Sequence, residues 1–122
     1  MPVLMVFLGG MLGAPLRFLT DKAVQQRHDS VFPWGTFVIN ISGSFILGAL
    51  GAATVHHHLP ADLSLLLGTG FCGGLTTFST FSFETVRLME DGSLAEAGLN
   101  AVGSLAFGLA AAALGYGVLT WL

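Results

Sequence analysis

The stretch that decides the fold runs from Gly68 to Thr85 and reads GTGFCGGLTTFSTFSFET. Four of its first seven residues are glycine, and the pair Thr76 and Thr77 follows soon after. Glycine is among the poorest helix formers, so this run is unfavourable for one continuous helix. We therefore predict a helix break near residues 73–77. The alternative, that the glycines serve only for close packing, stays open because their spacing fits both.

The chain around this stretch is apolar from end to end. Of its 122 residues, 53% are hydrophobic and only 9% are charged. Soluble domains carry about 25% charged residues, and a surface built from so few charges would expose large apolar patches to water. We therefore predict an all-α integral membrane protein. The net charge of −3 argues against a nucleic-acid partner, because phosphate binding needs a basic surface.

Four apolar segments are separated by polar clusters. A helix needs about 20 mainly apolar residues to cross a bilayer. The segments cover about residues 2–20, 34–56, 63–89 and 94–121, and the third contains the expected break in mid-membrane. The sequence thus predicts a single four-helix transmembrane domain over residues 1–122.

Small residues recur in these segments at the spacing of helix contacts. Gly9 with Gly13 and Gly70 with Gly74 form GxxxG pairs, which let helix backbones approach closely in lipid. Four short helices are too few to enclose a pore alone. We therefore expect the chain to form an oligomer.

The loops differ in their basic residues. Lys22, Arg27 and Arg87 lie in or beside the first and third loops, whereas the second loop and both termini have no Lys or Arg. This bias favours a cytoplasmic location for the first and third loops. His56–His58 fall in the short second loop, where we expect them to be solvated and assign them no role.

The residues around the expected break offer groups for ions of both signs. A break frees backbone carbonyl oxygens, which suit a small hard cation such as sodium. Phe78 and Phe81 share one helix face, with the hydroxyls of Thr77, Ser79 and Thr80 beside them. Aromatic ring edges are positive and can attract an anion, but such a pair also serves in a core or against lipid.

Two further polar side chains lie within the spans. Asn40 precedes Ser44 by four residues, so the two share a face of the second span, and Asn100 with Ser104 repeats the pattern. Polar residues in spans face an aqueous path or bind another helix, and both interpretations stay open here. Arg17 lies near the end of the first span, where it either reaches the interface or attracts an anion.

Three stretches together resemble a known family. GGMLGAPLRF, GTFVINISGSFILG and GFCGGLTTFSTFSFE closely resemble the CrcB or Fluc fluoride channels in order and spacing. The resemblance implies a passive, fluoride-selective channel that exports fluoride across the plasma membrane. It also implies an antiparallel, dual-topology homodimer with two pores, in which residues 1–122 form one four-helix transmembrane channel domain.

The resemblance also assigns roles to residues. It implies a structural sodium ion at the centre of the dimer, held by the backbone carbonyls of Gly73 and Thr76. The partners it implies are fluoride, a second copy of the chain and membrane lipid. The remaining residues that match the family's functional positions are the pore residues Phe78, Phe81, Asn40, Ser79, Thr80 and Ser104, together with the first-span Arg17.

Other classes fit the sequence less well. A small multidrug-type transporter has a similar length and span number, but it needs a carboxylate deep in its first span, where this chain has only Arg17 as a charge. A regulatory subunit without transport would leave the break unexplained. No nucleophile, metal cluster or acid pair indicates an enzyme. The sequence assigns no role to Glu84.

Overall fold

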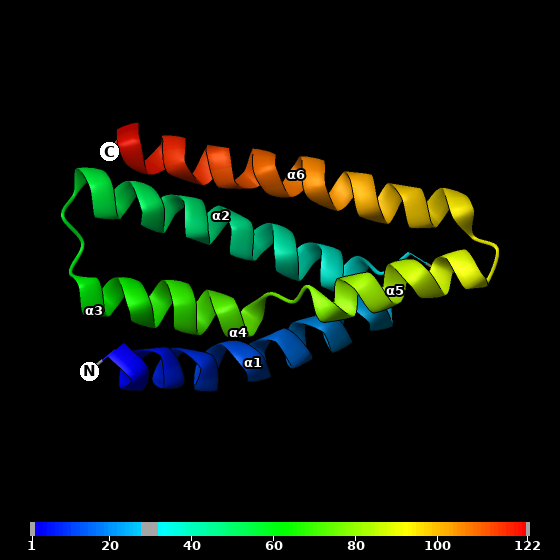
Figure 1. Cartoon of the computed structure of the whole chain (residues 1–122), viewed down its shortest axis with the longest axis horizontal. Coiled ribbons are helices and arrows are strands. Elements are labelled where there is room, and N and C mark those ends of the chain that lie inside the picture. The colour runs from blue at the N-terminus through cyan, green and yellow to red at the C-terminus, as the bar shows by residue number, and fades with distance from the viewer. Residues whose placement is uncertain (1, 28–31, 122) are drawn as a thin grey trace.

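The computed structural model describes residues 2–27 and 32–121, so the ends of the predicted domain and residues 28–31 lie outside it. The described residues form helices joined by short connections (Figure 1). In chain order the elements are α1 (Pro2–Arg27), α2 (Trp34–His56), α3 (Ala61–Ser64), the π-helix η1 (Leu65–Cys72), α4 (Gly73–Leu75), α5 (Ser79–Glu90) and α6 (Leu94–Trp121).

Three of these helices, α1, α2 and α6, are long and apolar enough to cross a membrane by length and composition. The bounds of α2 and α6 agree with the sequence prediction. The first span was expected to end near residue 20, but α1 continues to Arg27. The polar segment DKAVQQR contains several good helix formers, such as Ala, Lys, Gln and Arg, and so prolongs the helix.

The third apolar segment is divided into pieces, as the sequence predicted. Thr76 has an extended backbone with φ −83° and ψ 161°, and α5 begins only at Ser79. Figure 1 shows this extended link between α4 and α5. The predicted position was partly wrong, because Gly73 and its neighbour Gly74 are still helical. The break therefore lies at residues 76–78.

The glycines before the break serve close packing against α1. A Cβ added to Gly70 would lie 2.9 Å from the Cα of Gly9, and one added to Gly74 would lie 3.2 Å from the Cα of Gly10. Gly13 faces the backbone of Phe71 in the same contact. The GxxxG pair of α1 thus packs against the GxxxG pair of the η1–α4 segment. Such backbone proximity supplies the dispersion contacts that hold helices together in lipid.

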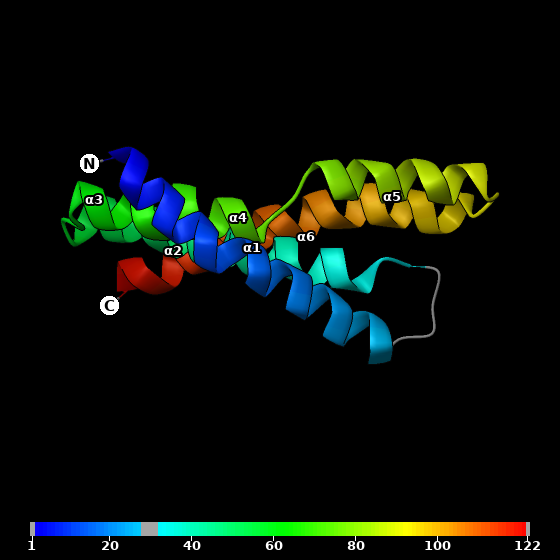
Figure 2. The same cartoon turned by 90° about the horizontal axis from the view of Figure 1, so that it is seen from below.

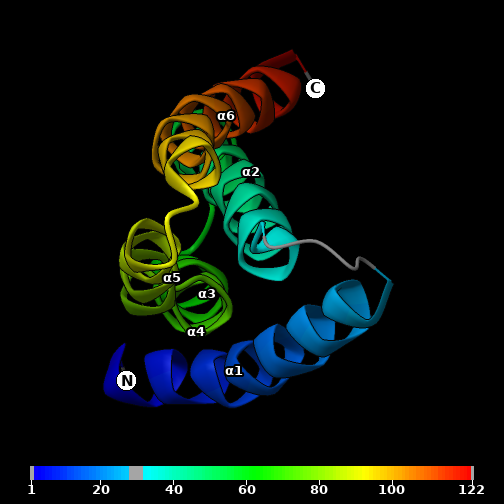
Figure 3. The same cartoon turned by 90° about the vertical axis from the view of Figure 1, so that its right-hand side faces the viewer.

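The contact between α2 and α6 is the most extensive in the molecule. A Cβ on Gly48 would lie 2.9 Å from the Cα of Ala112, and one on Gly115 would lie 3.1 Å from the backbone nitrogen of Ala49. Viewed from one end, α1 and α6 lie on opposite sides of α2 (Figure 3). Helices α1 and α6 therefore pack on the elements between them and, over their described residues, do not contact each other.

His56–His58 are exposed, as the sequence predicts, and two of them also bond to α6. His57 Nε2 donates a hydrogen bond to the carbonyl oxygen of Leu119 at 2.8 Å. His56, the last residue of α2, has its Nε2 3.2 Å from the hydroxyl oxygen of Tyr116. These bonds fasten the end of α2 to the end of α6.

The glycine contacts predict that one of two nearby substitutions lowers stability and the other does not. Gly115→Ala should lower the free energy of unfolding by about 1–3 kcal/mol, because the new methyl group would overlap the backbone of Phe45. Gly117→Ala is the matched control, since no atom outside its own helix lies within 4 Å of the added Cβ. Thermal unfolding in detergent measures both. Equal stability of the two variants would contradict the packing described for α2 and α6.

Candidate functional site

Asn40 of α2 holds the break through a pair of hydrogen bonds. Its Nδ2 donates to the carbonyl oxygen of Thr77 at 2.9 Å, and its Oδ1 accepts from the Thr77 backbone N–H at 2.9 Å. Both backbone groups of Thr77 are thereby satisfied outside any helix. This matters because an unbonded peptide group costs several kcal/mol in lipid, on the order of the values measured for apolar solvents.

The Thr77 side chain starts the helix that follows. Its Oγ1 accepts from the backbone N–H of Thr80 at 3.1 Å and donates to the Thr80 hydroxyl at 3.1 Å. The Ser79 hydroxyl lies 3.3 Å from the same oxygen. Thr77 thus acts like a helix cap, satisfying one of the N–H groups that the first turn of α5 leaves without a helical acceptor.

These side-chain bonds take two N–H groups away from helical acceptors. In a continuous α-helix the Thr77 N–H would donate to the carbonyl of Gly73, and the Thr80 N–H to that of Thr76. Here Asn40 and Thr77 accept them instead. The carbonyls of Gly73 and Thr76 are the pair that the family resemblance assigns to sodium, and carbonyl oxygens fit a hard cation.

A cavity of about 520 Å³ lies beside the break. It brings together four of the six predicted pore residues, Asn40, Phe78, Phe81 and Ser104. The rings of Phe78 and Phe81 have their centroids 5.9 Å apart, and Phe78 is 79% exposed. The other lining residues are Ser44, Leu47, Thr76, Thr77, Ala101 and Leu105.

A second cavity, of about 230 Å³, lies on the α1 side of the break. Arg17 and Thr80 line this cavity and not the first one, and Ser79 is exposed and lines neither. Thr77 lines both cavities and so separates them. The remaining lining residues of the second cavity are Ala14, Phe18, Asp21, Thr36 and Ile39. The predicted site residues are therefore divided between two chambers.

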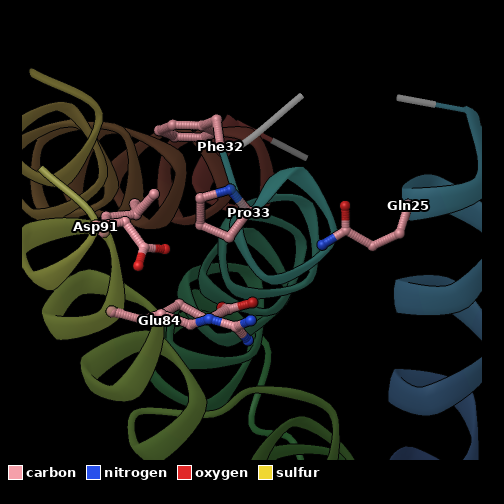
Figure 4. A pocket seen from close by; sticks show the side chains of 7 residues that line it. Gln25, Phe32, Pro33, Glu84 and Asp91 are labelled. Atoms are coloured by element: carbon pink, nitrogen blue, oxygen red, sulfur yellow. The ribbon is translucent and has the colours of Figure 1, made fainter. Parts of the chain in front are cut away.

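A third cavity, of about 280 Å³, opens where α1 and α5 diverge. Figure 2 shows the start of α2 between the ends of these two helices. In Figure 4, Gln25 comes from α1 on one side, and Glu84 and Asp91 come from the α5 side. The other lining residues are Phe32, Pro33, Arg87 and Leu88. This mouth is charged, as is the second cavity with Arg17 and Asp21, whereas the described residues that line the first cavity are all uncharged.

Thr36 connects the mouth to the second cavity. It lines that cavity, and its side chain lies near the Glu84 carboxyl group of the mouth. Among the described residues, Oε1 of Glu84 and Oδ1 of Asp21 are buried without a hydrogen-bond partner. The carboxylate of Asp21 lies against Gly35 in the first turn of α2. Polar side chains thus lie between the mouth and the second cavity.

Sequence reasoning missed several residues of this arrangement. Thr77 had a recognisable signal, because a threonine shortly before a helix is a frequent cap for the N–H group three residues later. Asp21 and Thr36 had none, since only the folded chain brings them together. Asn100 is fully buried, donates to the Thr85 hydroxyl at 2.8 Å and accepts from the Ser104 hydroxyl at 3.3 Å. Asn100 therefore binds α6 to α5.

Comparison with known proteins identifies the family. Residues 4–116 match the sequence profile of a family described as "CrcB-like protein, Camphor Resistance (CrcB)". The chain belongs to the CrcB family. Similar proteins include "Fluoride-specific ion channel FluC 1" of Streptomyces avermitilis, which is 55% identical over 92% of this chain and 90% of its own length.

Two more relatives carry related names. "Fluoride-specific ion channel FluC 1" of Frankia casuarinae is 50% identical over 92% of this chain and 91% of its own length. "Fluoride-specific ion channel FluC 2" of Mycobacterium tuberculosis is 48% identical over 90% and 84%, respectively. As a CrcB member with several apolar helices, the chain is a multi-pass plasma-membrane protein. The family is one of ion channels and not of enzymes.

The bond pair at the break predicts the effect of a near-isosteric change. Asn40→Asp keeps an acceptor for the Thr77 N–H but cannot donate to the Thr77 carbonyl, so two oxygens face each other. We expect a loss of about 1–3 kcal/mol in the free energy of unfolding. Thermal unfolding in detergent measures it, with Ser44→Ala as a control, because the Ser44 hydroxyl donates to the backbone oxygen of Asn40 within α2. An Asn40→Asp protein as stable as the wild type would remove Asn40 from this role.

Proposed function

We propose that this chain is a fluoride-selective channel through which fluoride leaves the cell passively. The observation that carries the proposal is the cavity beside the break, where Asn40, Phe78, Phe81 and Ser104 converge. The names of the relatives support fluoride as the ion. The family assignment replaces the small multidrug-type transporter that the sequence left as an alternative.

The chemistry of the cavity suits a small, tightly hydrated anion. Fluoride gives up its water only where hydrogen-bond donors replace it. Asn40 Nδ2 has one hydrogen left after its bond to Thr77, and the hydroxyl of Ser104 lies in the same wall. The positive edges of Phe78 and Phe81 attract an anion without a full charge that would trap it. Arg17 and Thr80 line the cavity on the other side of Thr77, and the Ser79 hydroxyl lies 3.3 Å from that of Thr77. We propose that these three residues extend the polar track.

We propose that the working unit is an antiparallel, dual-topology homodimer of subunits with four spans each. Phe78 supports this proposal, because a large apolar ring exposed beside a polar cavity is a surface for a second copy. Gly73 is also exposed, and a Cβ added there would meet nothing within 4 Å. A second copy can therefore approach the backbone at this point.

The proposed dimer contains one structural sodium ion. The carbonyls of Gly73 and Thr76, from each of two chains, would supply four oxygens to it. When bound, the cation would neutralise the converging carbonyl dipoles at the dimer axis. Because such a site exists only in the assembled dimer, sodium would stabilise the dimer by mass action.

The function predicts a selective efflux. Liposomes that contain the purified protein should release trapped fluoride rapidly and trapped chloride far more slowly, because the donors and ring edges of the cavity are matched to the smaller ion. An ion-selective electrode measures each anion in turn. Release of chloride as fast as fluoride, or release of neither, would refute the proposed selectivity.

The aromatic pair predicts a specific loss of flux. Phe78→Ile and Phe81→Ile should each reduce fluoride efflux by about tenfold or more, because isoleucine keeps apolar bulk but has no positive ring edge. Phe83→Ile is the matched control, since Phe83 lies on α5, is 64% exposed and lines none of the three cavities described above. Size-exclusion chromatography checks that each variant assembles. Wild-type flux in both test variants would restore a packing role for the two rings.

A further inference from the structure

At the break, side chains accept hydrogen bonds from two particular backbone N–H groups. The two N–H groups that bond to side chains belong to Thr77 and Thr80. In a continuous helix these two groups are the donors to Gly73 and Thr76. We propose that Asn40 and Thr77 are positioning residues for the sodium site: they hold these two N–H groups so that the carbonyls of Gly73 and Thr76 face a cation. This inference rests on the sodium site of the proposed function.

Removal of a side-chain acceptor leaves its N–H group in need of another hydrogen-bond acceptor. In the membrane interior no water replaces the acceptor, so the group must bond within the protein. The acceptor that an α-helix provides is the carbonyl four residues earlier. Without the Thr77 hydroxyl, the Thr80 N–H would return to the Thr76 carbonyl, and the helix would close over the site. The side chains thus decide between a continuous helix and exposed carbonyls.

The neighbouring carbonyl of Cys72 provides a contrast. It accepts both the backbone N–H and the hydroxyl of Thr76, each at 2.8 Å. The Cys72 carbonyl therefore already accepts two hydrogen bonds within the chain and is not available to an ion. The Cys72 carbonyl keeps its helical donor, the Thr76 N–H. The carbonyls of Gly73 and Thr76 do not, because the N–H groups of Thr77 and Thr80 bond to side chains instead.

The side chain of Thr76 is fixed in a way that leaves its own carbonyl as the ligand group. Its hydroxyl donates back to Cys72, and its γ-methyl group packs where Gly43 of α2 has no Cβ. The hydroxyl is therefore already used. The extended backbone of Thr76, with ψ 161°, turns its carbonyl out of the helical direction.

The test measures how much sodium raises the thermal unfolding midpoint of the purified full-length protein. Each variant is unfolded in sodium chloride and in the chloride of N-methyl-D-glucamine, an organic cation too large for a four-carbonyl site. Wild type and Thr77→Ser, which keeps the hydroxyl, should show the same sodium-dependent increase. Thr77→Val keeps the shape but not the acceptor, so its apparent sodium affinity should fall by about tenfold or more. Thr54→Val controls for loss of a hydroxyl, because Thr54 donates only to a carbonyl of its own helix.

A second pair of variants separates positioning from general stability. Asn40→Asp is expected to be less stable but still accepts the Thr77 N–H, so it should keep the sodium-dependent increase. Asn40→Leu lacks the acceptor and should lose the increase. If Asn40 had only a structural role, the sodium-dependent increase would fall in every destabilised variant, whether or not the new side chain can accept the Thr77 N–H.

The outcomes distinguish the inference from the site it rests on. If sodium stabilises Thr77→Val or Asn40→Leu as strongly as wild type, the positioning role is overturned and the sodium site stands. If sodium does not stabilise the wild type, the site itself is refuted, and the inference falls with it. Should Thr77→Val fail to assemble, the comparison of the two Asn40 variants decides by the same criterion.

Discussion

The paired hydrogen bonds between Asn40 and Thr77 are the interaction on which the rest of the structure depends. Lipid does not satisfy peptide groups, so an extended residue at membrane depth survives only if protein groups bond it. One carboxamide meets this requirement for both backbone groups of Thr77. The turn of the chain at Thr76, the separate start of α5 and the wall between the two inner cavities all follow from this pair.

Close helix packing positions this interaction. The glycines of α1 lie against Gly70 and Gly74, so the backbone of the η1–α4 segment packs directly on the backbone of α1. On the other side, Gly43 leaves room in α2 for the methyl group of Thr76. Asn40 lies three residues before Gly43, on the same face of α2. The small residues thus bring the break within hydrogen-bond distance of the Asn40 carboxamide. Glycine packing and polar bonding in this region therefore support each other.

The sequence predicted the break, the bounds of α2 and α6 and the polar side chains, because each depends on local composition. It placed the break over residues 73–77, which includes Thr76 but begins too early, because glycine propensity pointed to Gly73 and Gly74, whereas both are helical and Gly74 packs on α1. It also did not separate Arg17 from Asn40, since the wall formed by Thr77 arises only when α1, α2 and α5 pack. The roles of the individual site residues stay predictions.

The decisive measurement is a high-resolution structure of the protein in lipid and sodium. It should show an extended Thr76, the Thr77 N–H bonded to the carboxamide of Asn40, and the Thr80 N–H bonded to the Thr77 hydroxyl. It should also show a spherical density between the carbonyls of Gly73 and Thr76 from two copies. A continuous α-helix through this segment, with both N–H groups on those carbonyls, would contradict this arrangement.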